Sequence, residues 1–449
     1  MSLPAPLPQL QREAPFTLPI RVLQFGQGNF LRGFVDWQLD VLNERCGLDF
    51  GVVIVRPTSR SKAPRLDIQG GCYTTVLRGL DAHGALQTEV RKIACVQREL
   101  DLRIHFADYL ALARNPDVRF FVSNTTEAGI AVNSSDRYGD QPPETFPAKL
   151  TRWLHERYLH FAGHPSKGIV LLPCELIEAN GPVLEAAVRH YCKLWKLTPE
   201  FEAWLDQSCH FCSTLVDRIV TGYPSFEEIA QLQATLGYQD DFLLAGELYH
   251  YWAIEAPHWV AQELPLRRAG LNVQWVEDLA PIRLRKVAIL NGAHTVLAAV
   301  GLLAGIPTVG DAMQDPDLRD FVQATVTEEI IPVLPLDAAI LRAYADDVLL
   351  RFRNPHIQHP LQAIALNMAS KCVTRLLPQV KRFVETNGHF PPRLLLVLAA
   401  AIHGLKEPSD VLNAAVAGIA GLPDALVAER SRIETVGMRQ AMFGMGATA

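Results

Sequence analysis

The sequence predicts an α/β protein in which a Rossmann-type N-terminal domain with insertions is followed by an all-helical C-terminal domain. Its 449 residues exceed what one ordinary core accommodates, so at least two domains are expected. Between residues 20 and 278, short β-branched runs alternate with longer amphipathic stretches, which indicates βα units and a mostly parallel sheet. After residue 282, leucine, alanine and valine recur at helical spacing. We therefore expect a proline-rich arm over 1–18, the Rossmann-type domain over 19–279 and the helical domain over 280–449.

The expected sheet is built from five short apolar runs, at residues 20–25, 52–55, 118–123, 169–172 and 272–276. A helix is expected over 34–44, because Phe34, Trp37 and Val41 fall on one face that packs on the sheet. In the C-terminal part, helices are expected over 287–303, 318–331, 361–377 and 394–402. Turn-rich breaks at 305–307, 353–355 and 387–392 separate them.

Composition and charge describe a globular protein of the cytoplasm. The net charge of -6 gives no reason to expect nucleic acid or an anionic membrane surface as a partner. The proline-rich first residues lack the basic start and apolar run of a signal peptide, so we expect a loosely ordered arm. Residues 287–306 are long and apolar enough to cross a membrane, but they carry Asn291, His294 and three glycines without aromatic anchors. This favours a buried core helix.

Eight cysteines are scattered without the regular spacing of a secreted disulfide scaffold, which indicates reduced thiols in a cytosolic enzyme. Cys209 and Cys212 form a CxxC pair around His210, and a zinc enzyme built on these three residues is one alternative. Because no second cysteine pair lies nearby, buried structural thiols are favoured. We expect no metal.

Gly26 and Gly28 stand between an apolar strand and an amphipathic helix, in RVLQFGQGNFLRGF. In this position glycines permit a tight turn and let a dinucleotide pyrophosphate approach the helix N-terminus. The third glycine of the usual fingerprint is replaced by Leu31, so the pattern is incomplete. A glycine-bearing turn that serves only packing is the alternative.

Two further segments bear on the coenzyme. The second strand ends in Arg56 and Pro57 rather than in the acidic residue that binds the ribose of NAD. An arginine there can accept the 2′-phosphate of NADP or stack on adenine, which leaves the choice between NAD and NADP open. Polar residues also follow the third strand, where open α/β sheets bind ligands: Ser123, Asn124, Thr125, Thr126 and Glu127. A helix cap is the alternative for these residues.

Three polar residues, Lys286, Asn291 and His294, interrupt an otherwise apolar helix. At about 100° per residue, Asn291 and His294 lie roughly 140° and 80° from Lys286, so all three project within one sector. The alternative treats Lys286 as a helix-start charge, Asn291 as a cap and His294 as a satisfied core histidine. Together they suit alcohol oxidation and carbonyl reduction. Lys286 exchanges the proton, Asn291 stabilises the oxyanion, and His294 orients a neighbouring hydroxyl.

The patterns K-x-x-x-x-N-x-x-H and F-G-x-G-N-F-L-R resemble the polyol-specific long-chain dehydrogenases, which include mannitol dehydrogenase and the hexuronate oxidoreductases. The resemblance continues through VVIVRP, SNTTEAGI, PCELI, FCSTLVDRIVTGYP, KVAILNGAHT and RFRNP. It implies an NAD-dependent, metal-independent enzyme acting on a small sugar acid, with Lys286 as its catalytic lysine. The implied further site residues are Asn291 and Asn180 as oxyanion donors, and Asp217, His294 and Lys371. The coenzyme would contact Gln24, Phe25, Gly26, Gly28, Asn29, Phe30 and Arg32.

One departure from the family concerns the substrate. Mannitol-type members carry an arginine eight residues before the substrate-binding lysine, where this chain has Ala363. The loss argues against a simple polyol and for a sugar acid, whose carboxylate is left to Arg218, Arg351 or His359. Arg218 in an ion pair and Arg351 in a structural turn are the alternatives. Open alternatives for the activity are the other hexuronate epimer and a non-catalytic nucleotide sensor; no oligomeric state is predicted.

Overall fold

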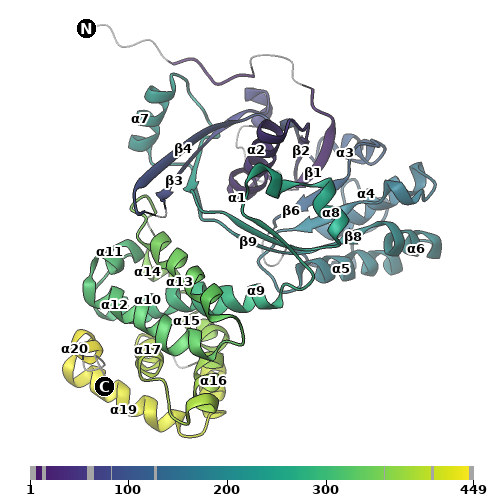
Figure 1. Ribbon diagram of the computed structural model, residues 1–449. Coiled ribbons are helices and arrows are strands. Elements are labelled where there is room, and N and C mark those ends of the chain that lie inside the picture. Colours follow the sequence, from purple (N-terminus) through teal and green to yellow (C-terminus); the bar gives the residue numbers. More distant parts are fainter. Residues whose placement is uncertain are drawn as a thin grey trace, which may run out of the picture. The chain divides into compact units, whose positions relative to one another are not determined.

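The computed structural model describes residues 7–12, 17–57, 65–81, 83–125, 129–357, 359–405 and 409–443. The chain forms two compact units, one comprising Met1–Arg78 and Thr88–Leu279, the other Gly79–Gln87 and Ala280–Ala449 (Figure 1). The first is a Rossmann-type unit and the second is helical, so the predicted fold class is confirmed.

A six-stranded parallel sheet forms the centre of the first unit, with strand order β5-β2-β1-β6-β7-β8. Its strands are β1 (Ile20–Phe25), β2 (Gly51–Arg56), β5 (Val96–Asp101), β6 (Phe120–Ser123), β7 (Val170–Pro173) and β8 (His210–Phe211). The sheet is therefore doubly wound, and the strand order reverses between β1 and β6. Ligands of such sheets bind where the order reverses, at the carboxyl ends of the strands.

Helices cover both faces of this sheet (Figure 1). On one face, Val22 and Ile54 pack against the helix that follows β1, including Phe34 and Leu42. On the other face, Leu23 packs in a core shared with helices further along the chain. The helical segments of this unit are α1 (Asn29–Leu31), η1 (Arg32–Asp36), α2 (Trp37–Cys46), η2 (Leu66–Gln69), α3 (Phe106–Leu112), α4 (Phe146–His160), η3 (Pro165–Lys167), α5 (Asn180–Leu194), α6 (Pro199–Ser208), α7 (Phe226–Leu236), α8 (His258–Glu263) and η4 (Leu266–Ala269).

The insertions form two smaller sheets, which the sequence pattern did not reveal. One has the order β10-β11-β3-β4 and the other β13-β12-β9. Their strands are β3 (Tyr73–Leu80), β4 (Leu86–Ile93), β9 (Ser213–Asp217), β10 (Val220–Gly222), β11 (Leu244–Glu247), β12 (Tyr251–Glu255) and β13 (Val273–Val276). The predicted strand 272–276 therefore exists as β13, but it belongs to this side sheet rather than to the central parallel one.

The N-terminal arm is more ordered than predicted, within the part that the structure describes. Gln9 forms a bridge with Gln239, and the side chain of Leu10 is buried. Arg12 donates hydrogen bonds to the carbonyls of Gly70 and Val96, at 2.6 and 2.5 Å. These contacts correct the expectation of a loose arm for residues 7–12.

The second unit is helical throughout its main segment and shares one core. Its elements are α9 (Ala280–Arg285), η5 (Lys286–Asn291), α10 (Gly292–Leu303), α11 (Val309–Gln314), α12 (Pro316–Ala324), η6 (Thr325–Ile330), η7 (Ile331–Val333), α13 (Ala338–Phe352), α14 (Leu361–Ile364), α15 (Met368–Lys371), η8 (Cys372–Leu376), α16 (Leu377–Asn387), α17 (Pro392–His403), α18 (Asp410–Ala417), α19 (Leu422–Val436) and α20 (Met438–Phe443). The predicted helix 361–377 is interrupted at Asn367, whose φ of 57° is left-handed.

The long apolar segment Ala280–Leu303 passes the length and hydropathy test for a membrane span, but 72% of its most apolar window is buried inside the protein. Ala293, Val296 and Leu297 contribute to the core of the helical unit. The expected buried core helix is confirmed.

Leu297→Ala should lower the free energy of unfolding by about 2–5 kcal/mol, because it removes a fully buried side chain and leaves a cavity. Chemical denaturation measures the loss. Val427→Ala, on the exposed side of α19, is the control and should change stability by less than about 0.5 kcal/mol. Equal effects of the two substitutions would contradict the assigned core.

Candidate active site

The turn between β1 and α1 has the geometry that close approach of a phosphate requires. Gly26 has a φ of +123°, which L side chains rarely adopt, and its N–H donates to the Val55 carbonyl at 2.9 Å. A Cβ at Gly26 would lie 3.4 Å from the Asn124 carbonyl, so the ends of β1 and β6 adjoin here. A Cβ at Gly28 would meet nothing within 4 Å. Gly28 thus leaves the backbone open at the point where the strand order reverses, whereas the buried Gly26 provides the tight bend.

Gly33, rather than a glycine at position 31, provides the third close approach. A Cβ at Gly33 would lie 2.9 Å from Leu244 and 3.0 Å from Val220, on strands β11 and β10. The helix therefore packs tightly against the insertion sheet. Close packing thus requires a glycine at position 33, two residues after Leu31, and the side chains that it meets belong to the insertion sheet.

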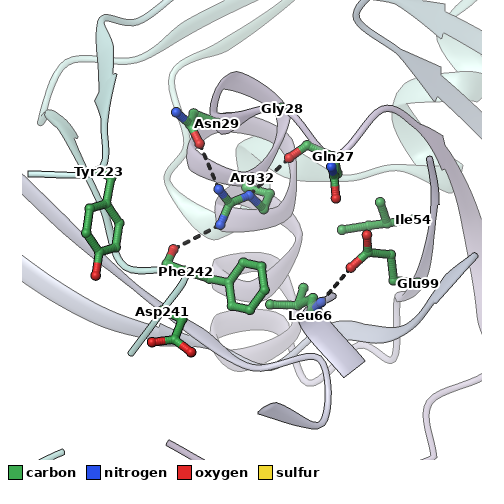
Figure 2. A pocket seen from close by; sticks show the side chains of 10 residues that line it. All are labelled: Gln27, Gly28, Asn29, Arg32, Ile54, Leu66, Glu99, Tyr223, Asp241 and Phe242. Atoms are coloured by element: carbon green, nitrogen blue, oxygen red, sulfur yellow. Dashed lines mark hydrogen bonds between the residues drawn. The ribbon is translucent and has the colours of Figure 1, made fainter. Parts of the chain in front are cut away.

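A cavity of about 490 Å³ adjoins the glycine turn (Figure 2). Gly28, Asn29 and Arg32 were predicted from the sequence. Seven other lining residues were not predicted: Gln27, Ile54, Leu66, Glu99, Tyr223, Asp241 and Phe242. They come from segments far apart in the chain, so no local pattern signals them. The volume, the open glycine and the adjacent helix N-terminus fit part of a dinucleotide.

Arg32 holds this turn together instead of pointing freely into the cavity. Its guanidinium donates to the carbonyls of Gln27 at 3.2 Å and Phe242 at 2.9 Å, and to Asn29 Oδ1 at 2.7 Å (Figure 2). It also lies over the rings of Tyr73 and Phe242. Arg32 therefore positions Asn29 and the turn, a role that differs from direct phosphate binding.

Three more residues predicted to contact the coenzyme instead contact other parts of the protein. Gln24 is fully buried, and its Nε2 donates to the Gly26 carbonyl at 3.2 Å. Phe25 is a core side chain, and Phe30 stacks on Phe34 with 4.9 Å between ring centroids. These contacts support the shape of the turn.

Arg56 does not offer its charge to a phosphate in this structure. Its side chain is buried, and its Nε lies 3.3 Å from Glu99 Oε1. The other carboxylate oxygen of Glu99 accepts from the Leu66 N–H at 2.6 Å (Figure 2). The predicted 2′-phosphate acceptor is thus paired with an acid, and the neighbouring Pro57 contributes its carbonyl to Lys149 at 3.5 Å.

The polar segment after β6 is fixed by a buried carboxylate. Glu175 accepts hydrogen bonds from the Ser123 hydroxyl and from both the N–H and hydroxyl of Thr125, at 3.0–3.1 Å. Asn124 Nδ2 donates to the Cys174 carbonyl at 2.6 Å. Burial raises the pKa of Glu175, while these donors favour its charged form. Thr126 and Glu127 lie outside the described residues.

In the helical unit, a π turn changes the predicted spacing of the catalytic residues. The residues from Lys286 to Asn291 form the π-helical segment η5, between the α-helices α9 and α10. Hydrogen bonds of a π-helix join residues five apart, so Asn291 lies about one turn from Lys286. The angle of roughly 140° expected from a regular α-helix is therefore wrong. The two residues are better aligned than predicted, and π turns are frequent at functional sites.

His294 is a neutral histidine with one unsatisfied nitrogen. Burial, and next the neighbouring His359, hold the pKa of His294 well below its usual value. A backbone hydrogen bond joins its ring to Leu290, whereas the buried Nε2 has no partner among the described residues. The His294 ring contacts Phe352 at 4.3 Å and His359 at 5.0 Å between centroids. A buried neutral imidazole with an open nitrogen can accept a hydroxyl hydrogen.

The predicted oxyanion donor Asn180 and the predicted carboxylate ligand Arg218 both bind main-chain groups of the first unit. Asn180 Nδ2 donates to the carbonyls of Pro173, Glu175 and Thr214, each at 3.0 Å, and its Oδ1 accepts from the Thr214 N–H. With both amide hydrogens engaged, Asn180 is a clamp between β7, β9 and α5, and the predicted oxyanion role is not supported.

Arg218 is likewise fully engaged. It donates to the carbonyls of Gly33, Leu248 and Tyr249 at 2.8–3.0 Å and lies 4.0 Å from the Trp37 ring centroid. Burial lowers its pKa to about 9. These main-chain contacts give no support to the prediction that Arg218 binds a substrate carboxylate. Asp217, the residue before it, is a buried side chain at the end of β9.

Cys209 and Cys212 cannot share a metal, because they face opposite sides of the central sheet. They flank the short edge strand β8, and each belongs to a different hydrophobic core. Burial raises the pKa of each thiol to about 12. Within the described ranges, no group of three or more His, Cys, Asp or Glu residues could hold a metal ion. The zinc alternative is not supported.

Family comparisons cover both units. The mannitol dehydrogenase Rossmann domain family matches residues 20–268, and the mannitol dehydrogenase C-terminal domain family matches residues 278–416. The altronate oxidoreductase of Pectobacterium carotovorum subsp. carotovorum (strain PC1) is 53% identical over 384 residues, which cover 86% of this chain and 78% of that protein. The altronate oxidoreductase of Yersinia enterocolitica serotype O:8 / biotype 1B (strain NCTC 13174 / 8081) is 52% identical over 392 residues, covering 87% and 81%.

Two solved structures share the fold. D-sorbitol dehydrogenase in substrate-free form has a TM-score of 0.82 at 22% identity and covers 97% of this chain and 98% of its own. Mannitol 2-dehydrogenase of Pseudomonas fluorescens, in a ternary complex with NAD and D-mannitol, has a TM-score of 0.71 at 21% identity, covering 98% and 97%.

Gly28→Ala should weaken NADH binding by at least about tenfold without lowering the melting temperature, because the added methyl enters open space at the turn. Gly26→Ala should weaken binding and also cost about 1–2 kcal/mol of stability, because its φ is strained for alanine. Fluorescence titration and thermal unfolding separate the two effects. Unchanged NADH affinity in Gly28→Ala would remove the turn from the coenzyme site.

Proposed function

The chain belongs to the mannitol dehydrogenase family, and on this premise we propose that it reduces D-tagaturonate to D-altronate with NADH, in the breakdown of hexuronates. The observation that carries the substrate is the similarity to altronate oxidoreductases, at 52–53% identity over 86–87% of the chain. The absence of the mannitol-type arginine, replaced by Ala363, agrees with a substrate other than a simple polyol.

NAD is the coenzyme we assign, bound at the glycine turn and its adjoining cavity. The pairing of Arg56 with Glu99 supports NAD over NADP, because the arginine charge at the end of β2 is already neutralised by an acid. A 2′-phosphate would have to displace that buried pair, at the cost of leaving Glu99 charged and unpaired. The NAD in the mannitol 2-dehydrogenase complex is in agreement with this choice.

The proposed mechanism assigns one task to each polar residue of the α9–η5–α10 helix. In reduction, the Lys286 ammonium donates a proton to the carbonyl oxygen, and in oxidation its amine accepts that proton. The Asn291 amide donates to the oxyanion as negative charge develops. Neutral His294 accepts from a substrate hydroxyl through its unpartnered Nε2 and so orients the carbon chain. When bound, the nicotinamide coenzyme supplies the hydride to the carbonyl carbon.

This chemistry needs no metal, and we place it in the cytoplasm. The buried position of Ala280–Leu303 favours a water-soluble protein, and the thiols of Cys209 and Cys212 are protonated at neutral pH. Activity should accordingly persist after treatment with a chelator.

Lys286→Ala should lower kcat by roughly 10²–10⁴-fold while the protein still folds and binds NADH, because only proton transfer is removed. Steady-state kinetics and NADH titration measure the two properties. Lys381→Ala, an exposed lysine of α16, is the matched control and should retain full activity. Turnover close to that of the unsubstituted enzyme in Lys286→Ala would defeat the mechanism.

A substrate panel tests the assignment of the reaction. D-tagaturonate and D-fructuronate are each offered with NADH and with NADPH, and the oxidation of reduced coenzyme is followed by absorbance. We expect the highest kcat/KM for D-tagaturonate with NADH. A preference for D-fructuronate would indicate the other hexuronate epimer, and tight NADH binding without turnover of any substrate would indicate a nucleotide sensor.

A further inference from the structure

Another π turn of the helical unit lies against η5. The residues Cys372–Leu376 form η8, which follows directly on α15 and packs against both η5 and α10. Arg375, in this turn, donates through Nη1 to the Asn291 carbonyl at 3.4 Å and to Thr295 Oγ1 at 3.2 Å. A guanidinium is therefore fixed beside Asn291, and no pattern in the sequence distinguished it from a surface arginine.

Arg375 has only neutral partners in the described part of the chain. Both of its hydrogen bonds to described residues come from one nitrogen and end on a carbonyl and a hydroxyl oxygen, and it forms no salt bridge with these residues. Among the residues that the structure describes, Lys371, one turn earlier, donates its Nζ only to the Ile364 carbonyl, at 2.6 Å. Arg351 differs, because it lies close enough to Asp347 to oppose the rise that burial causes in the pKa of that carboxyl. Arg375 and Lys371 are thus two neighbouring cations that form no ion pair with any described residue.

The cations repel one another and the nearby imidazoles. Burial, and next the charge of Arg375, lower the pKa of Lys371. Burial, and next Lys371, lower the pKa of His359. Burial also lowers the pKa of Arg375 itself. Like charges that are half-buried and close together destabilise the folded protein unless an anion binds between them. Such positive clusters therefore attract anions.

An independent feature points to a ligand at the same place. The Nε2 atom of the half-buried His294 is itself buried and has no hydrogen-bond partner among the described residues. Its neighbour Thr295 accepts the hydrogen bond from Arg375. A buried nitrogen without a partner among the described residues and the Arg375 guanidinium therefore lie at the same part of the helix, beside Asn291.

We infer that Arg375, assisted by Lys371, binds the carboxylate of the sugar-acid substrate and thereby distinguishes acids from neutral sugars. The inference rests on the proposed function. It gives Arg375 the role of carboxylate ligand, which the main-chain contacts of Arg218 do not support. The Nε and Nη2 atoms of Arg375 form no hydrogen bond with described residues and can form the two parallel bonds of an arginine–carboxylate pair. With the carboxylate held there, the remaining hydroxyls reach toward Asn291 and His294.

The test compares an acid with its neutral counterpart. Arg375→Met should lower kcat/KM for D-tagaturonate by about 10- to 100-fold, mainly through KM, and should change D-tagatose reduction by less than about threefold. D-altronate binding to the enzyme–NADH complex, measured by calorimetry, should weaken by a similar factor. Arg375→Lys should recover part of the loss, because it keeps the charge but not the paired geometry.

Arg382→Met, a half-buried arginine of the following helix α16, is the matched control and should leave both substrates unaffected. Equal losses on acid and neutral sugar in Arg375→Met, or unchanged D-altronate affinity, would overturn the inference. If the unsubstituted enzyme acts on a different sugar acid, the proposed function fails, and the same comparison on that acid still decides the role of Arg375. If it acts only on neutral sugars, both fail.

Discussion

A buried main-chain carbonyl without a hydrogen-bond donor costs about 1–3 kcal/mol, and this requirement shapes the N-terminal unit. Long polar side chains supply the donors where regular pairing ends. Arg157 alone serves the carbonyls of Ala113, Asn115, Val118 and Lys167. Arg218 and Asn180 serve three each. These bonds connect the loops between the sheet strands, and the bond from Arg218 to the Gly33 carbonyl joins β9 to the helix that follows the glycine turn.

The fold was largely predictable because it rests on periodicity. Apolar runs placed four strands of the central sheet, and helical spacing placed the core helix of the second unit. The side sheets were not predictable, because their short strands pair with segments distant in the chain, as β3 does with β11. The break at Asn367 was also missed, since a left-handed residue leaves little trace in an apolar pattern.

Site residues could be predicted where the residue type itself indicates the chemistry. They could not be predicted where the role of a side chain depends on its neighbours in the folded protein. Gly26 and Gly28 form the expected turn, with Gly26 buried at the tight bend and Gly28 exposed. Arg56 looked like a phosphate ligand because Glu99, its partner, is more than forty residues away in sequence. Arg375 escaped notice for the opposite reason: what distinguishes it is the lack of a counterion within the described residues, and only three-dimensional neighbours reveal that.

The π turn at Lys286–Asn291 affects the hydrogen bonding of the helix that contains it. A wider turn accommodates one residue more than an α-helical turn and loses regular hydrogen bonding in exchange. If the asparagine followed the lysine by four positions instead of five, both side chains would lie on one face of a regular α-helix. The extra residue therefore marks a place where regularity has been given up, in the middle of the most apolar helix of the protein. Such local conflicts with ideal geometry are expected where selection acts on chemistry rather than on stability.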